Sequence, residues 1–136
     1  MRALTSCAAV LSGLAVGGCP IGGDDEAKPK AGPAKEITGL VEALEEATRR
    51  RDFVKVCNEL LTTEARRQVG GPDCAKLLKS AARDLENPEI ETRRVKLKHD
   101  AAEVRVRTSA RGRPPVDDTI ELVRERGEYR ISALAG

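Results

Sequence analysis

The chain has 136 residues, enough for one domain, and its 24 Lys and Arg nearly balance 22 Asp and Glu, giving a net charge of +2. Such a balance lacks the basic excess typical of nucleic-acid-binding proteins. The only aromatic residues are Phe53 and Tyr129, so base stacking and a large aromatic-lined ligand pocket are both disfavoured. We therefore expect no nucleic acid among the partners.

The first 18 residues have the layout of a secretory signal peptide. Met1-Arg2 is a short positive start, and the uncharged run from Ala3 to Val16 is too short for a comfortable membrane span. The segment Leu14 to Cys19 resembles a bacterial lipobox, in which an aliphatic residue and small residues precede a cysteine. The resemblance implies cleavage before Cys19 and attachment of diacylglycerol to its thiol. The alternative is ordinary signal-peptide cleavage, which leaves Cys19 as a free thiol.

Residues 19–34 are rich in Gly, Pro and charges of both signs and show no apolar periodicity. This composition predicts a solvated tether, and a flexible chain of this length spans on the order of 20 Å. The expected organisation is a signal peptide at 1–18, the lipidated cysteine and tether at 19–34, and a folded domain at 35–136. The expected location is the extracytoplasmic face of the cell membrane, with the membrane as a partner through lipidated Cys19.

Four cysteines are present, and two of them have a role in this scheme. Cys7 leaves with the signal peptide and Cys19 takes the lipid, so Cys57 and Cys74 remain as an even pair in an oxidising compartment. We expect a disulfide between them, with free thiols as the alternative. His99 is the only histidine, so a four-ligand zinc site is not available and we expect neither a metal nor a cofactor.

From residue 35 the apolar residues recur at helical spacing, and three shorter helices are expected to follow before residue 88. The first helix should end at Arg49-Arg50-Arg51, a run whose alternative role is contact with anionic lipid headgroups. Both Cys57 and Cys74 fall on apolar helical stripes, so their disulfide should be buried. The expected N-caps of the later helices are Asp52, Thr62 or Thr63, and Asp73. The expected apolar stripe of the last helix is Leu77, Leu78, Ala81, Ala82 and Leu85.

After Glu89 the apolar period drops to two, which predicts strands. A turn at His99-Asp100 would pair Leu97 with Ala102 and Val95 with Val104. Residues 109–116 contain glycine and two prolines and are expected to form a longer loop.

A second hairpin is expected to join residues 118–124 to the final strand. A turn at Arg126-Gly127 would pair Leu122 with Ile131 and Ile120 with Ala133. In both hairpins the apolar residues fall on one face, which predicts an antiparallel sheet with one face packed on helices.

Helices followed by a meander of strands predict an α+β fold, with N-terminal helices packed on a curved antiparallel sheet of about four strands. The chain resembles the nuclear transport factor 2-like superfamily from Ile37 to Leu134. The matching features are the helix Ile37–Ala47, the Cys57–Leu61 turn with the later Cys74, the strand Val104–Val106, and the ending Leu122–Ile131 with its aromatic Tyr129. The resemblance implies a cone whose cavity serves isomerase or dehydratase chemistry in some members and only binding in many.

Polar residues with inward strand parity are the candidates for such a cavity: Arg93, Asp118, Arg124 and Tyr129. They form no recognisable acid–base dyad, so no catalytic residue is assigned. Arg124 and Tyr129 are expected to form a cation–π or packing pair, and Tyr129 is not expected to act as an acid. The outward parity gives a candidate docking face for an acidic partner or lipid headgroups, with a merely solvated face as the alternative: Arg94, Lys96, Lys98, Arg105 and Arg107.

The sequence therefore favours a membrane-anchored, non-catalytic binding or interaction module that takes a protein partner or a small apolar ligand. Two alternatives stay open. One is a small cavity enzyme of the same fold, and the other is a structural or regulatory lipoprotein of the cell envelope.

Overall fold

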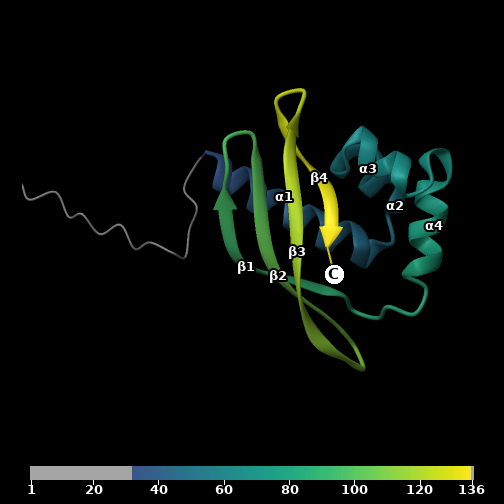
Figure 1. The fold of residues 1–136 in the computed structure, drawn as a ribbon. Coiled ribbons are helices and arrows are strands. Elements are labelled where there is room, and N and C mark those ends of the chain that lie inside the picture. Colours follow the sequence, from purple (N-terminus) through teal and green to yellow (C-terminus); the bar gives the residue numbers. More distant parts are fainter. Residues whose placement is uncertain (1–31, 136) are drawn as a thin grey trace, which may run out of the picture.

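The computed structural model describes residues 32–135, in which four helices pack on a four-stranded antiparallel sheet (Figure 1). This confirms the expected α+β architecture. No helix in this range is long and apolar enough to cross a membrane. The helical elements are α1 (Pro33–Arg50), α2 (Phe53–Lys55), a π-helix (Val56–Leu60), α3 (Thr63–Gln68), a 3₁₀ turn (Gly71–Asp73) and α4 (Cys74–Ala81). The strands are β1 (Glu89–Leu97), β2 (Ala101–Ala110), β3 (Arg113–Glu125) and β4 (Glu128–Ala135), in the spatial order β1-β2-β3-β4.

Helix α1 lies across the inner face of the sheet, behind the strands in Figure 1. Proline at its first position suits a helix start, because the missing N–H would have no helical partner there. The helix ends where Arg51 adopts a left-handed conformation (φ 58°). It begins two residues before the expected domain boundary at 35. One stripe of α1 is buried against the sheet, as its spacing predicted: Ile37, Val41, Leu44 and Ala47.

Two hydrogen bonds fix the direction of α1 along the sheet. Near its start, Glu36 accepts a bond from the Tyr129 N–H (3.0 Å), next to the turn between β3 and β4. Near its end, Glu45 accepts a bond from the Ile90 N–H (2.6 Å) at the start of β1. The turns β1–β2 and β3–β4 lie at the same end of the sheet, where Arg124 N–H bonds Asp100 C=O (3.0 Å). The chain therefore enters the domain at the end of the sheet that carries these two turns.

The β1–β2 hairpin has the register that the alternation predicted around its turn. Leu97 lies opposite Ala102 and Val95 opposite Val104. The prediction fails further along, because an extra residue forms a bulge between Thr92 and Arg94. Beyond a bulge the in–out alternation is reversed, so the residues before it face the other way from what simple parity predicts.

The second hairpin shows the same combination of success and error. Leu122 lies opposite Ile131, as predicted, but Ile120 lies opposite Leu134 and not Ala133. A register shift between Glu121 and Leu122 separates the two pairs. Near the turn, the alternation of apolar and polar residues predicts the strand register correctly, but it does not predict where an extra residue is inserted.

The predicted loop at 109–116 is wrong. Strand β2 continues to Ala110, β3 starts at Arg113, and a two-residue turn with Gly112 at φ 75° joins them. Pro114 and Pro115 fall at a register shift in the β2–β3 ladder, and β4 pairs with β3 only from Thr119 onward. Proline has no N–H to donate to a neighbouring strand, and it is tolerated at this position because the ladder is irregular there and only one strand lies beside it. The β2–β3 hairpin extends beyond β4, and its tip also extends beyond the pairing of β1, which reaches Ser109 (Figure 1).

The short helices are capped largely as expected. Asp52 accepts a bond from Lys55 N–H (3.1 Å) and Thr62 from Ala65 N–H (3.0 Å). Asp73 occupies the N-cap position of α4 but makes no side-chain cap bond. Its backbone (φ −93°, ψ 5°) continues the preceding 3₁₀ turn instead of the extended geometry that a capping side chain needs.

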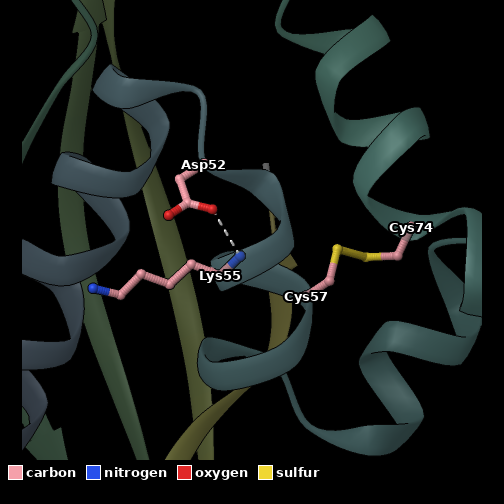
Figure 2. Close-up of a disulfide and its surroundings, with 4 residues drawn as sticks. All are labelled: Asp52, Lys55, Cys57 and Cys74. Atoms are coloured by element: carbon pink, nitrogen blue, oxygen red, sulfur yellow. Dashed lines mark hydrogen bonds between the residues drawn. A yellow bond between two sulfur atoms is a disulfide. The ribbon is translucent and has the colours of Figure 1, made fainter.

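The π-helix and α4 meet at the cysteine pair, which is at disulfide distance with the Cα atoms 6.2 Å apart (Figure 2). Cys57 is 3% exposed and Cys74 1% exposed, so both are buried as the apolar stripes predicted. The rest of α4 is less buried than expected. Leu77 is 48% exposed and Ala81 is also exposed, and within the helix only Cys74 is fully buried.

Candidate functional site

An apolar groove opens on the inner face, at the end of the sheet opposite the entry of the chain. Leu44 and Thr48 in the last two turns of α1 form one wall, and Ile120 and Leu134 form another. The cavity measures about 290 Å³. A second hollow of about 320 Å³ continues it between the loop after α4 and the β2–β3 hairpin. The two hollows form one groove because they share three lining residues: Thr48, Ile90 and Thr108.

The groove exists because the helical layer is shorter than the strands. Helix α1 ends at Arg50, whereas β2 and β3 continue into the hairpin beyond it. The apolar inner face of that hairpin has no helix over it, so Val116 remains 52% exposed, and Leu134 near the end of β4 remains 56% exposed. Such a concave apolar surface with few polar groups is typical of sites for apolar ligands.

Asp118 is the one ionisable side chain that lines the inner part of this groove. It is half-buried, and its Oδ2 accepts a hydrogen bond from Thr108 Oγ1 (3.1 Å) across the β2–β3 pair. The sequence parity that made Asp118 a cavity candidate therefore places it correctly. A carboxylate at this point can accept a hydrogen bond from a ligand or pair with a ligand cation.

Arg124 and Tyr129 lie far from the groove, at the turn end of the sheet. The Arg124 guanidinium stacks 4.3 Å from the centroid of the Tyr129 ring, as expected for a cation–π pair. Tyr129 is buried, and the exposed Arg124 covers its ring and donates a hydrogen bond to the Gly127 carbonyl (3.0 Å). The four cavity candidates are thus not brought together.

Arg93 is the candidate that the structure contradicts. Because of the bulge between Thr92 and Arg94, it is exposed and pairs with Glu91 (2.8 Å). It lines a hollow of about 280 Å³ with four other charged residues, which together we name the arginine recess: Arg93, Arg94, Arg105, Arg107 and Asp117. Three of the five expected docking-face residues, Arg94, Arg105 and Arg107, belong to this recess.

Within the arginine recess, Arg107 and Asp117 form an ion pair between neighbouring strands. Arg107 Nε lies 3.0 Å from Asp117 Oδ1. This hydrogen bond and charge raise the pKa of Arg107 and lower the pKa of Asp117, and the charges of Arg105 and Arg93 lower the latter further. The four guanidinium groups of the recess outnumber Asp117 and the neighbouring Glu91, which pairs with Arg93, so the recess keeps an excess of positive charge.

The remaining docking-face residues lie toward the turn end of β1. Lys98 pairs with Glu103 (3.2 Å), and Lys96 lines a neighbouring hollow of about 250 Å³ that shares Arg94 and Arg105 with the arginine recess. His99 is exposed at the hairpin tip beside Asp100. Among residues 32–135 no cluster of three or more potential metal ligands is found.

Several groove residues were not identified from the sequence. Thr48, Ile90, Thr108 and Leu134 come from four separate elements, and nothing in their local pattern differs from ordinary helix or strand residues. The sequence did contain one signal for the groove. The inward apolar positions of β3 continue as far as Val116, past the part of the strand that α1 covers.

The comparisons with known proteins bear on the fold. No family model matches the chain, and no curated protein matches it in sequence. Solved structures do match. A nuclear transport factor 2-like protein of unknown function from Silicibacter pomeroyi superposes with a TM-score of 0.57 at 19% identity, covering 74% of this chain and 91% of that one. The domain has a nuclear transport factor 2-like fold.

Two further structures support this nuclear transport factor 2-like assignment. One is a nuclear transport factor 2-like protein of unknown function from Shewanella baltica, with a TM-score of 0.53 at 16% identity, covering 76% of this chain and 94% of that one. The other is a de novo designed protein of this fold, with a TM-score of 0.52 at 16% identity, covering 75% and 85%. At these identities the likeness establishes the fold and no activity.

Proposed function

We propose that this protein is a lipid-anchored, extracytoplasmic module that binds a small apolar ligand in the groove between α1 and the sheet, without catalysing a reaction on it. The observation that carries the proposal is the uncovered apolar groove at the end of the sheet opposite the start of α1. A chain attached to a membrane through residues before α1 would present this groove away from its attachment point.

The anchoring part of the proposal depends on Cys19, which lies outside the described residues. Its support is the order of positive start, apolar run and lipobox-like segment Leu14 to Cys19. The mature protein from the membrane fraction is expected to have an intact mass that starts at a diacylglycerol-modified Cys19. Cys19→Ser should release the protein from that fraction, and a native mass starting at any other residue would contradict the anchor.

The binding part follows from the chemistry of the groove. Its inner hollow is lined by three threonines, one carboxylate and five aliphatic residues: Leu44, Ile90, Val106, Ile120 and Leu134. This composition suits an apolar ligand body with one polar group directed at Asp118. It offers no general acid beside the carboxylate, which disfavours acid–base chemistry.

The groove can be tested with a neutral apolar fluorophore, N-phenyl-1-naphthylamine, titrated into the mature protein. We expect saturable binding that Leu134→Glu weakens about tenfold or more, because it introduces a charge into an apolar cavity. Leu97→Glu is the matched control, because Leu97 is similarly exposed (49%) but lies at the opposite end of the sheet. Equal loss in both variants, or no saturable binding, would contradict a ligand-binding groove.

One observation favours a cavity enzyme as the second candidate, namely the Asp118 carboxylate inside an apolar groove. Asp118→Asn separates the two functions. A binding module should retain its affinity for the neutral fluorophore in this variant, and it has no turnover to lose. An enzyme whose base is Asp118 should lose turnover of its substrate while binding persists.

A further inference from the structure

A β-bulge brings four arginines to one place on the outer face of the sheet. In a regular strand, Arg93 and Arg94 would point to opposite faces. The extra residue between Thr92 and Arg94 leaves both exposed and both lining the arginine recess. Bulges commonly redirect a side chain in this way next to functional sites.

Across the ladder, the next strand adds two more arginines. Arg94 lies directly opposite Arg105, and Arg107 follows two residues later on the same face. Like charges placed directly opposite each other destabilise a sheet. No ion pair within residues 32–135 engages Arg94 or Arg105, whereas Arg93, Arg107 and Lys98 each have a carboxylate partner.

The charges of the arginine recess do not cancel. Four guanidinium groups outnumber two nearby carboxylates: Asp117, which Arg107 holds through two hydrogen bonds (3.0 and 3.4 Å), and Glu91, which pairs with Arg93 (2.8 Å). Arg94 and Arg105, which have no ion-pair partner within residues 32–135, both line this hollow of about 280 Å³. Guanidinium groups recognise carboxylate and phosphate through paired N–H bonds, and a phosphate, with its greater charge and more oxygen atoms, can engage two guanidinium groups at once.

We propose that the arginine recess is a phosphate-binding site, in which Arg94 and Arg105 hold a phosphate group between β1 and β2. Arg93 and Arg107 flank the group and add positive field, and Asp117 orients Arg107. The site is on the opposite face of the sheet from the apolar groove, so it does not depend on the function proposed for that groove.

The test uses glycerol 3-phosphate as the probe, titrated calorimetrically into the native protein at 150 mM NaCl, with acetate as the comparison anion. We expect saturable binding of the phosphate ester, no binding of acetate, and at least about tenfold weaker binding in Arg94→Gln/Arg105→Gln. Arg66→Gln/Arg83→Gln removes the same charge from α3 and from the loop after α4, and this control should bind as the native protein does.

Two further arms make the result decisive. Arg105→Lys keeps the charge but removes the guanidinium fork, so it should bind glycerol 3-phosphate more weakly than the native protein does. This single variant keeps the site testable if the double variant does not fold. Flotation with phosphatidylglycerol vesicles and with phosphatidylcholine vesicles tells whether the phosphate comes from a lipid headgroup or a soluble ester. Equal affinity in native protein, Arg105→Lys and the double variant, equal loss in the control, or equal binding of acetate would overturn the site.

Discussion

Two apolar regions share the inner face of the same sheet, and they differ in what covers them. Toward the entry of the chain, α1 and the short helices close over the strands, so Leu122 and Ile131 are fully buried. Toward the β2–β3 turn the helical layer ends, and Leu134 and Val116 remain half-exposed around a groove. The first region stabilises the fold, whereas the second leaves apolar surface unused by folding, which is the property of a binding site.

The largest expected effect comes from truncating the covered region. Leu122→Ala removes a completely buried side chain and should cost about 3 to 4 kcal/mol of unfolding free energy. Leu134→Ala, on the neighbouring strand but 56% exposed, should cost less than about 1 kcal/mol. Urea unfolding of both variants measures the difference. Similar costs would mean that the groove is an ordinary part of the core.

The cysteine pair gives an effect of comparable size on the covered side. Cys57→Ala/Cys74→Ala opens a loop with a sequence separation of 17 and should cost about 3 kcal/mol. The loss should appear as a lower midpoint in denaturant under non-reducing conditions, while binding of the fluorophore by the groove stays unchanged below that midpoint. A variant as stable as the native protein would show that packing alone holds α4.

A smaller effect is expected where the covered region joins the groove. The Arg51 guanidinium donates to the carbonyls of Ala82 (3.0 Å) and Leu85 (3.0 Å), and so ties the end of α1 to the segment after α4. Arg51→Ala should cost about 1 kcal/mol, because the donors are charged but largely solvated. Arg50→Ala is the control, since Arg50 bonds only within α1. Thermal unfolding of the pair checks the prediction.

The smallest effect concerns acid. Thr63 donates its N–H (3.0 Å) and its hydroxyl (2.9 Å) to the Glu125 carboxylate, and these bonds lower the pKa of Glu125 below its ordinary 4.5. A lowered folded-state pKa means that the contribution to stability is complete above pH 4.5 and is lost as pH falls through the lower folded value. Glu125→Gln should therefore be slightly less stable at pH 7 and lose less stability between neutral pH and acid. If Glu125→Gln had the same pH dependence of stability as the native protein, the lowered pKa of Glu125 would not contribute to stability.

The sequence predicts the parts of this fold that repeat a local rule. The stripe of α1, the caps at Asp52 and Thr62, and the hairpin pairs Leu97–Ala102 and Leu122–Ile131 all follow from periodicity or side-chain chemistry near the residues themselves. The inward position of Asp118 follows from the same alternation.

What failed depends on features that act between strands. The bulge at Arg93 falls in a run of charged residues that shows no alternation of apolar and polar side chains, so no sequence pattern marks the inserted residue. Pro114 and Pro115 resemble a loop because proline weakens a strand, yet a register shift and a single neighbouring strand make them acceptable. The groove depends on where α1 stops relative to β3, which is a difference in length between layers and not a motif.

The sparse burial of α4 makes its attachment to the domain sensitive to reduction of the disulfide. Only Cys74 of this helix is fully buried, while Ala75 and Leu78 pack against the core only in part, so the disulfide is an important part of what holds α4 to the domain. In a reducing compartment the helix should open locally and exchange its amide hydrogens rapidly, while α1 and the sheet stay protected. The disulfide therefore makes the attachment of α4, and not the packing of α1 on the sheet, the part of the fold that depends on redox conditions.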